Sequence, residues 1–147
     1  MQSRAYQVQA EILEQCLVEL SPMPNRVVVV PGAQAVWDSC CDGMLYCALV
    51  SLQPKRQAAK CTGWTAVLKV GVIRCCATVD DYGNAPSVRQ INHDAELMMN
   101  DMTTLQRVLG ASSCVDTLDG WEPLGPEGGC AGGEWTITRH LPFETLD

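Results

Sequence analysis

The stretch WTAVLKVGVIRCC, residues 64–76, decides the fold of this chain. Every second residue from Ala66 to Val72 is apolar, and the residues between them form a more mixed row that includes Lys69 and Gly71. In an extended segment, alternate side chains lie on opposite faces. The pattern therefore predicts a long strand with one face turned to the core.

Two further apolar stretches precede this strand. RVVVV, residues 26–30, predicts a short strand that ends at Pro31-Gly32. MLYCALVSL, residues 44–52, is apolar on both faces, so we expect a strand that is covered on both sides, by helices or by another subunit. The polar and basic residues 53–63 predict an exposed loop.

An amphipathic helix is predicted before these strands, over residues 4–20. Its apolar residues recur at spacings of three and four, which places them on one helical face. Pro22 and Pro24 prevent its continuation. The apolar positions are Ala5, Val8, Ile12, Cys16 and Leu20.

A second helix is predicted over residues 88–109, where the helical periodicity is strongest. Ser87 and Gln90 match a capping box, in which each side chain satisfies a free backbone donor, and Gly110 ends the helix. The expected apolar stripe consists of Ile91, Ala95, Met98, Met102, Leu105 and Leu109. The acidic residues expected on its outer sides are Asp94, Glu96 and Asp101.

The chain has the length of a single domain, residues 1–147, with a sheet core over 26–76. A Gly/Pro-rich loop, residues 119–133, leads to a half-buried closing strand, EWTITRHL, and the two together cover 119–141. This order of elements predicts an α+β fold. We expect a mostly antiparallel sheet of about four strands packed by two helices.

Composition excludes some classes of function. The net charge of −7 argues against a protein that binds nucleic acid or an anionic membrane through a basic face. No run of apolar residues is long enough to predict a membrane span. The first residues, MQSRAYQVQAEILEQC, carry scattered charges and no apolar core, so we expect no secretory signal and folding in a cytoplasm.

Nine cysteines fit such a compartment poorly, because cytosolic thiols normally stay reduced. The spacings do not match a structural zinc site, and adjacent cysteines on extended segments would point to opposite faces, so no metal ligand is predicted. Buried free thiols and disulfides both stay open. The candidates for disulfides are Cys40, Cys41, Cys75, Cys76 and Cys130. Cys130 is a plausible partner for the 40–41 pair, but sequence does not assign connectivity.

Catalytic motifs are not recognised. A nucleophilic thiol needs a base, and the only histidines are His93 and His140. GPEGGCAGG lacks the lysine and hydroxyl residue of a phosphate loop, and Asp80–Asn84 lacks the ligand pattern of a calcium loop. We therefore expect no catalytic residue and no cofactor, hence a structural or assembly protein and not an enzyme.

Residues 64–141 carry a family resemblance. The strand TAVLKVGVIRCC, the acidic loop VDDYGNAP, the helix ending LQRVLG and the segment GWEPLGPEGGCAGGEWTITRHL follow in that order. This succession resembles the tail-terminator and head-to-tail connector proteins of long-tailed phages (siphoviruses), particularly those of actinobacterial hosts. The opening helix, VVVVPG and WDSCCDGMLYCALVSL fit the same layout.

The resemblance implies a virion protein of the neck, assembled in the cytoplasm of a bacterial host. Tail terminators form a ring, usually hexameric, that caps the tail tube and joins it to the head connector. The implied partners are copies of the same chain, the tail tube protein and the head connector or stopper. Genomic DNA would pass through the lumen without specific binding, since an acidic bore repels phosphate.

The resemblance also suggests contact residues. Asp80, Asp81 and Tyr82 are expected to face the lumen or a neighbouring ring. Trp121, Leu124 and Trp135 are expected at interfaces. Two alternatives stay open. One is another neck component, either a head-to-tail stopper or an adaptor, and the other is a cysteine-rich regulatory domain that binds metal or reacts through thiols.

Overall fold

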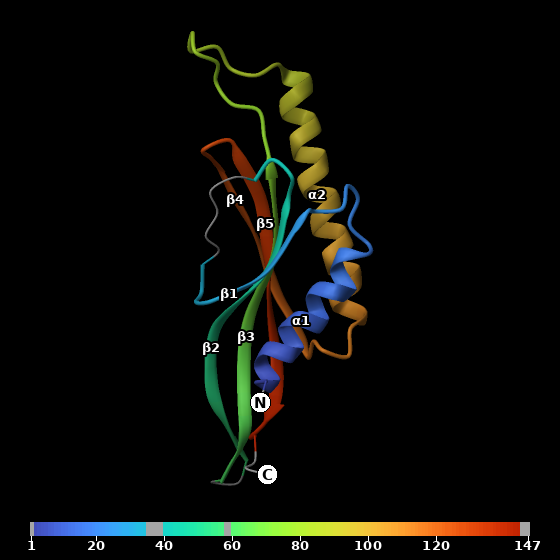
Figure 1. Cartoon of the computed structure of the whole chain (residues 1–147), viewed down its shortest axis with the longest axis vertical. Coiled ribbons are helices and arrows are strands. Elements are labelled where there is room, and N and C mark those ends of the chain that lie inside the picture. The colour runs from blue at the N-terminus through green and yellow to red at the C-terminus, as the bar shows by residue number, and fades with distance from the viewer. Residues whose placement is uncertain (1, 35–39, 58–59, 145–147) are drawn as a thin grey trace.

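Five strands form one mixed sheet in the order β1-β2-β3-β5-β4, and two helices cover one face of it (Figure 1). The structure is a computed structural model and describes residues 2–34, 40–57 and 60–144. The elements are α1 (Arg4–Leu17), β1 (Arg26–Val30), β2 (Met44–Gln57), β3 (Lys60–Cys75), α2 (Val88–Ala111), β4 (Thr117–Glu127) and β5 (Cys130–Pro142).

The expected α+β class is confirmed, whereas the details of the sheet differ from the prediction. The sheet has five strands, and β1 runs parallel to β2 while the other neighbouring pairs are antiparallel. A parallel pair needs a crossover connection. Here that connection is the segment 31–43, of which residues 35–39 lie outside the described part.

The long strand predicted from residues 64–76 is β3, and it lies at the centre of the sheet. It pairs with β2 on one side and with β5 on the other. The apolar row of β3 is buried against both helices together with side chains of β2 and β5. The row consists of Ala66, Leu68, Val70 and Val72, and its main helical partners are Ile12, Cys16, Leu105 and Leu109.

Residues 44–48 of β2 are buried on both faces, as expected, whereas Val50 and Leu52, in the same predicted stretch 44–52, are exposed. Leu45 and Cys47 join the core under the helices. Tyr46 and Ala48 face the other way and join a smaller cluster. The remaining buried members of that cluster are Val30, Cys40, Met44, Ile73 and Cys130. The chain itself therefore covers both faces of this part of β2.

Two predicted loops are strands. Residues 53–57 of β2 pair with residues 60–65 of β3, so the predicted loop 53–63 is mostly the outer part of a long hairpin. Residues 119–133, also predicted as a loop, contain most of β4, a turn at Gly128-Gly129 and the start of β5. Exposed strands lack the apolar alternation that identifies half-buried ones, and glycine and proline hide the remaining signal.

Glycines allow β5 to approach its neighbours closely. A Cβ at Gly132 would overlap the backbone carbonyl of Val72, and a Cβ at Gly133 would overlap the ring of Trp121. Gly128 and Gly129 adopt positive φ angles of 59° and 78° in the turn. The glycine-rich sequence therefore serves tight turning and close packing, as its composition suggests.

α1 ends at Leu17, before the predicted end at residue 20, although Leu20 is still buried. Its expected apolar face is confirmed by the burial of Val8, Ile12 and Cys16. Ser3 caps the helix, since its side chain accepts a hydrogen bond from the backbone N–H of Tyr6.

α2 continues two residues beyond its predicted end and is buried mainly in its C-terminal half. Leu105 and Leu109 are almost fully buried, whereas Ile91, expected in the same apolar stripe, is 48% exposed. Ser87 accepts a hydrogen bond from the backbone N–H of Gln90, as predicted. The Gln90 side chain, however, donates to Asp94 and does not complete the capping box.

Asp101 was predicted on the outer side of α2, and this is wrong. It is only 7% exposed and forms a bidentate ion pair with Arg74 of β3. Arg74 Nε lies 2.7 Å from Oδ2, and Nη2 lies 3.0 Å from Oδ1. Nη2 also donates to the carbonyl oxygen of Pro22, 2.7 Å away. A helical pattern identifies no partner on another element, so the sequence contained no signal for this pair.

Candidate functional site

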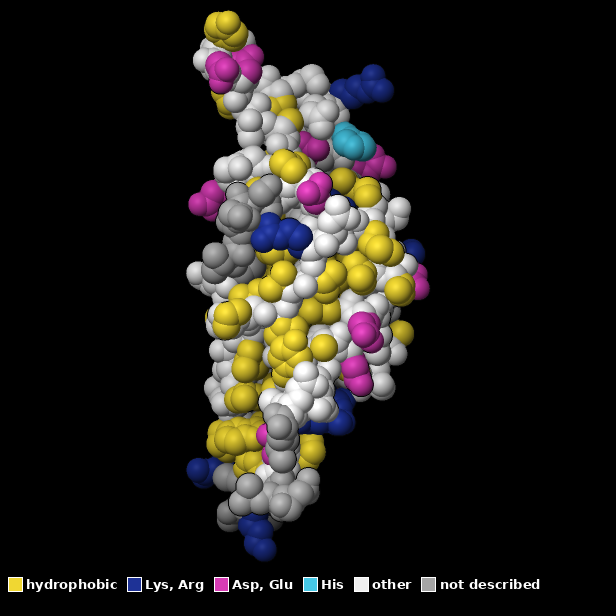
Figure 2. Space-filling model, in the orientation of Figure 1, with side chains coloured by type: hydrophobic (Ala, Val, Ile, Leu, Met, Phe, Trp, Pro, Cys, Tyr) yellow, Lys and Arg dark blue, Asp and Glu magenta, His cyan; other side chains and the backbone are white. Residues whose placement is uncertain are grey.

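The two ends of the elongated molecule carry opposite charges. The β3–α2 loop, residues 76–87, extends from one end and exposes Asp80 and Asp81. The β2–β3 hairpin extends from the other end and exposes Lys55, Arg56 and Lys60, which we call the basic tip. In Figure 2 acidic side chains lie at the tip of the upper end, with a basic side chain projecting beside them, and basic side chains predominate at the lower end.

Asp80 organises the β3–α2 loop. Its Oδ1 accepts hydrogen bonds from the backbone N–H groups of Tyr82 and Asn84, each at 2.9 Å, and its Oδ2 accepts from the Asn84 side chain at 3.2 Å. These bonds, those from Asn84 first, lower the pKa of Asp80. The Asp80 carboxylate thus binds groups of its own loop, whereas the Asp81 side chain is exposed to solvent.

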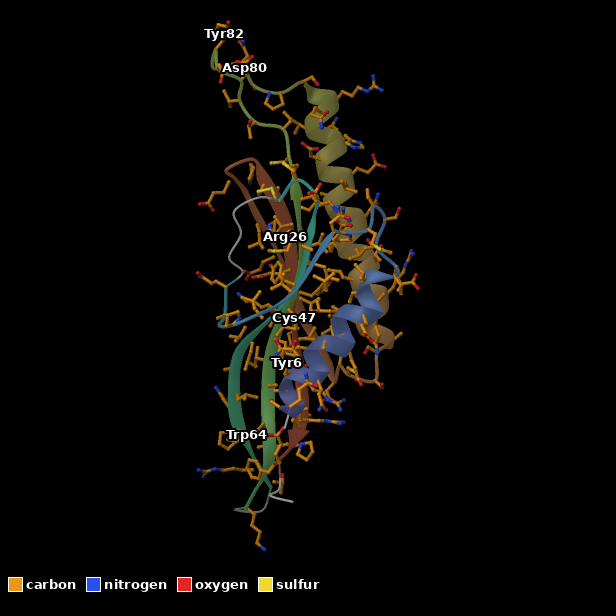
Figure 3. All side chains as sticks on the ribbon, in the orientation of Figure 1. Tyr6, Arg26, Cys47, Trp64, Asp80 and Tyr82 are labelled. Atoms are coloured by element: carbon orange, nitrogen blue, oxygen red, sulfur yellow. A yellow bond between two sulfur atoms is a disulfide. The ribbon has the colours of Figure 1, made fainter. Side chains whose placement is uncertain are left out.

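The turn presents Tyr82 at its end. Tyr82 is 90% exposed, and Gly83 beside it has a φ of 82°. Figure 3 shows Tyr82 and Asp80 together at the far end of the molecule, away from Trp64 near the opposite end. The three residues expected to face a lumen or a neighbouring ring therefore lie together on one projecting loop. Which partner they face stays a prediction.

The predicted interface residues do not form one patch. Trp121 and Trp135 lie opposite each other on β4 and β5, and both are half-buried. Trp135 packs against the main core, and its Nε1–H donates to the carbonyl oxygen of Met102, 3.0 Å away. Trp121 lies over Gly133. Contacts within the chain thus occupy much of both indole rings.

Leu124 has a different setting, because it lines an apolar groove. The groove has a volume of about 490 Å³ and lies between the β3–α2 loop, the exposed half of α2 and the β4–β5 turn. Its apolar lining includes Val79, Ile91, Met98 and Pro123. The groove therefore adjoins the acidic end of the molecule.

The outer part of β2 has a free edge. β1 pairs only with Met44–Ala48, so along residues 49–57 no described strand pairs with β2 on the side away from β3. Val50 and Leu52 on this part are 38% and 39% exposed. An open edge with apolar side chains is a template for another strand. Sequence reasoning missed it, because residues 53–63 were predicted as a loop.

Four of the candidate cysteines form two disulfides. Cys40 is bonded to Cys130, with Cα atoms 5.9 Å apart, and Cys41 is bonded to Cys75, with Cα atoms 4.6 Å apart. The first agrees with the expected partnership of Cys130 and the 40–41 pair. Cys76, also a candidate, is a free thiol.

The expectation that adjacent cysteines point apart is wrong for Cys40 and Cys41. It assumed an extended segment, but the chain turns here, and the Gly43 N–H donates to the Cys40 carbonyl oxygen at 2.9 Å. Both sulfur atoms therefore reach the ends of β3 and β5. The Cys40 Sγ lies 4.0 Å from the Cys75 Sγ of the other disulfide.

The free thiols of the described residues are held in their protonated form. Burial raises the pKa of Cys16 and of Cys47 to about 12. Burial also raises the pKa of Cys76, and that of Cys114, whose Sγ donates to Glu11 at 3.1 Å. A protonated thiol is a poor nucleophile. In this structure, no cluster of three or more potential metal ligands occurs among the described residues.

A buried polar network lies on the face of the sheet opposite the helices. The Tyr46 hydroxyl donates to Glu134 Oε2 at 2.6 Å, and Lys69 Nζ lies 3.0 Å from Glu134 Oε1. Burial, followed by the contact with Glu134, raises the pKa of Tyr46 and keeps its hydroxyl protonated. The Tyr46 ring lies over Gly71, where any Cβ would overlap it. The network joins β2, β3 and β5, and sequence reasoning did not identify it.

No protein-family model matches the chain, and no curated protein matches its sequence. The resemblance of residues 64–141 to phage neck proteins therefore stays a prediction. Within residues 2–34, 40–57 and 60–144, no helix is both long and apolar enough to cross a bilayer.

Proposed function

We propose that this protein is a structural subunit of a phage virion at the head–tail junction, and specifically a tail terminator. In this role, copies of the chain form a ring that caps the tail tube and joins it to the head connector. The observation that carries the proposal is the difference between the two projecting ends. One end exposes Asp81 and Tyr82 and the other exposes the basic tip, which suits a ring subunit between two unlike neighbours.

Lateral contacts within the ring use the free edge of β2. Backbone groups of residues 49–57 that are unpaired in the described sheet can accept a strand or loop from the next subunit, and Val50 and Leu52 add apolar area. The groove at Leu124 adds a second apolar surface near the acidic end. These surfaces give the subunit lateral contacts as well as contacts along the ring axis.

The charge of the chain suits a ring through which DNA passes. A net charge of −7 per subunit repels phosphate, whereas a lumen lined by lysine would retain DNA through the release of counterions. Asp81 is the better candidate than Asp80 for repelling DNA in the lumen, because the Asp80 carboxylate accepts hydrogen bonds within its own loop.

The proposal is tested by electron microscopy of the purified protein mixed with tails that lack a terminator and with DNA-filled heads. The expected result is ring-shaped density on tail ends, and joined particles when heads are added. Binding to heads alone would indicate a stopper or adaptor. A protein that stays monomeric and joins neither component would contradict the proposal.

Asp81→Lys, with Asp80 intact, tests the charge in the lumen without removing the bonds that hold the loop. We expect rings to form while DNA ejection becomes slower. Arg107→Lys, on an exposed part of α2, is the control that preserves charge. If Asp81→Lys particles eject DNA at the normal rate, Asp81 does not face the lumen.

A further inference from the structure

We propose that the reduced form of this protein binds Zn(II) through Cys40, Cys41, Cys75 and Cys130. In a ZnS₄ tetrahedron with Zn–S bonds of about 2.3 Å, neighbouring sulfurs are about 3.8 Å apart. The two disulfides place all four sulfurs in one cluster, and the Cys40–Cys75 sulfur separation between them is already 4.0 Å. Reduction therefore leaves four thiols close together, with one separation already near that of a Cys₄ zinc site, and the two formerly bonded pairs have to move apart to complete it.

The fold holds the four residues together even without the disulfides. Cys75 and Cys130 lie directly opposite each other at the paired ends of β3 and β5. Cys40 and Cys41 lie on the turn that leads into β2, the other neighbour of β3. The turn allows both sulfurs to point to the same strand ends, so the objection that applies to adjacent cysteines on a strand does not apply here.

The chemistry requires a reducing compartment. Each disulfide takes two electrons and two protons from a thiol reductant, such as a cellular dithiol, and gives two thiols. Zn(II) then replaces one proton on each of the four thiols, so binding releases four protons in total. Soft thiolate ligands without histidine or carboxylate favour zinc over magnesium or calcium.

The site is accessible on one side. Cys40 and Cys130 are 3% and 6% exposed, whereas Cys41 and Cys75 are exposed residues. An ion can therefore enter beside Cys41 and Cys75 and reach the buried pair. A closed shell of four protein ligands is the arrangement of structural zinc sites, so the ion would replace the two cross-links as the tie between these segments.

Co(II) titration of the whole chain, fully reduced and kept free of oxygen, tests the proposal. We expect the strong visible absorption of tetrahedral Co(II)–thiolate coordination, saturating at one ion per chain, and its loss when Zn(II) is added. The oxidised protein should show no such absorption, because its four sulfurs are bonded in pairs. Absence of the absorption in the reduced protein would overturn the proposal.

Single serine variants identify the ligands. Cys41→Ser and Cys130→Ser should weaken Zn(II) binding by at least about 100-fold, since even outer-shell changes cost 10–100-fold. Cys114→Ser is the matched control, because Cys114 is also buried but packs against Glu11, and it should bind Zn(II) as the wild type does. Unchanged Zn(II) binding in Cys41→Ser and Cys130→Ser would mean that zinc is bound elsewhere and would contradict the proposal. Because the comparison of reduced and oxidised wild type needs no variant, misfolding of a variant cannot hide the answer.

This site is independent of the proposed virion role. A protein that binds zinc but joins no tail would contradict only the proposed function. A protein that forms rings on tails but binds no zinc when reduced would contradict only the zinc site.

Discussion

At the scale of single residues, Tyr46 and Glu134 form a buried polar pair between β2 and β5. Tyr46 is fully buried and Glu134 is 8% exposed, so the carboxylate depends on the Tyr46 hydroxyl and on Lys69 for its partners. A buried polar group that loses its partner costs about 1–3 kcal/mol.

Tyr46→Phe should therefore lower the free energy of unfolding by about 1–3 kcal/mol, because it removes the hydroxyl and leaves the ring in place. Urea denaturation followed by circular dichroism measures this. Tyr82→Phe removes the same atom from a side chain that is 90% exposed and should leave stability unchanged. If the two variants are equally stable, the hydrogen bond from Tyr46 to Glu134 makes no net contribution to the free energy of unfolding.

Asp80 makes the order of the β3–α2 loop depend on pH. The pKa of Asp80 is lower in the folded protein than in the unfolded chain. The ionised carboxylate therefore stabilises the folded loop fully at any pH above the ordinary pKa of an aspartate. This stabilisation is lost as the pH falls through the lowered pKa that Asp80 has in the folded protein. We expect the amide protons of Tyr82 and Asn84 to shift in NMR spectra over that acidic range. In Asp80→Ala, the two amides should show no such transition.

Residue patterns identified the buried positions of α1 and β3, but they failed where a side chain meets another element. Asp101 illustrates this limit. Its spacing along α2 predicts an outer position, yet Arg74 on β3 brings it into a buried ion pair. The Tyr46–Glu134 bond was missed for the same reason, since it joins residues 88 positions apart in the sequence.

At the scale of elements, the Arg74–Asp101 ion pair fixes α2 to the sheet. The two side chains are only 11% and 10% exposed, and Arg74 also holds the carbonyl oxygen of Pro22. Removing one partner leaves a charge that is mostly buried and uncompensated.

Asp101→Asn should lower the free energy of unfolding by about 3 kcal/mol, near the lower end of the range for broken buried pairs. Glu96→Gln, an equivalent change on the exposed side of α2, should have no measurable effect. Thermal unfolding of both variants at one protein concentration provides the comparison. A stable Asp101→Asn protein would mean that the Arg74 guanidinium is solvated at little cost once its carboxylate partner is gone.

Strand elements were predictable where one face is buried and the other is not. Residues 64–76 show this alternation and were assigned correctly, while residues 53–57 and 119–127 were not. The outer hairpin is polar, and β4 is interrupted by Pro123, Gly125 and Pro126. Pairing with a neighbouring strand stabilises such segments, and a local pattern does not record the neighbour.

At the scale of the whole molecule, the separation of charge between the ends is the main feature that the sequence did not show. Asp81 and Lys60 are close enough in sequence to suggest a single region of mixed charge. β3 separates them, because it runs most of the length of the molecule between the two projecting ends (Figure 1). Composition gave the net charge but not this arrangement.

A charge reversal at the basic tip tests whether this end makes an electrostatic contact in the proposed assembly. The triple variant Lys55→Glu, Arg56→Glu, Lys60→Glu should join tails less efficiently, and the wild-type contact should weaken as salt is added, because exposed charges are screened over about 10 Å at 0.1 M. Co-sedimentation with tails measures this.

Arg107→Glu, which reverses a charge on an exposed part of α2, is the control for the basic tip. It should sediment with tails as the wild type does, and both variants should retain the wild-type melting temperature because all of these side chains are exposed. If the triple variant joins tails normally, the basic tip has no role in that contact.

The exposed half of α2 has a mechanical consequence. The helix is anchored near its middle by Asp101 and towards its end by Leu105 and Leu109, while its first turns run out beside the β3–α2 loop (Figure 1). The first turns contact the loop, since the Ala77 N–H donates to Asp94 Oδ2 at 2.9 Å, but they do not reach the main core. A partner that pushes on the loop therefore acts on α2 as well as on β3, and the Arg74–Asp101 ion pair is the buried contact that resists movement of the helix against the sheet.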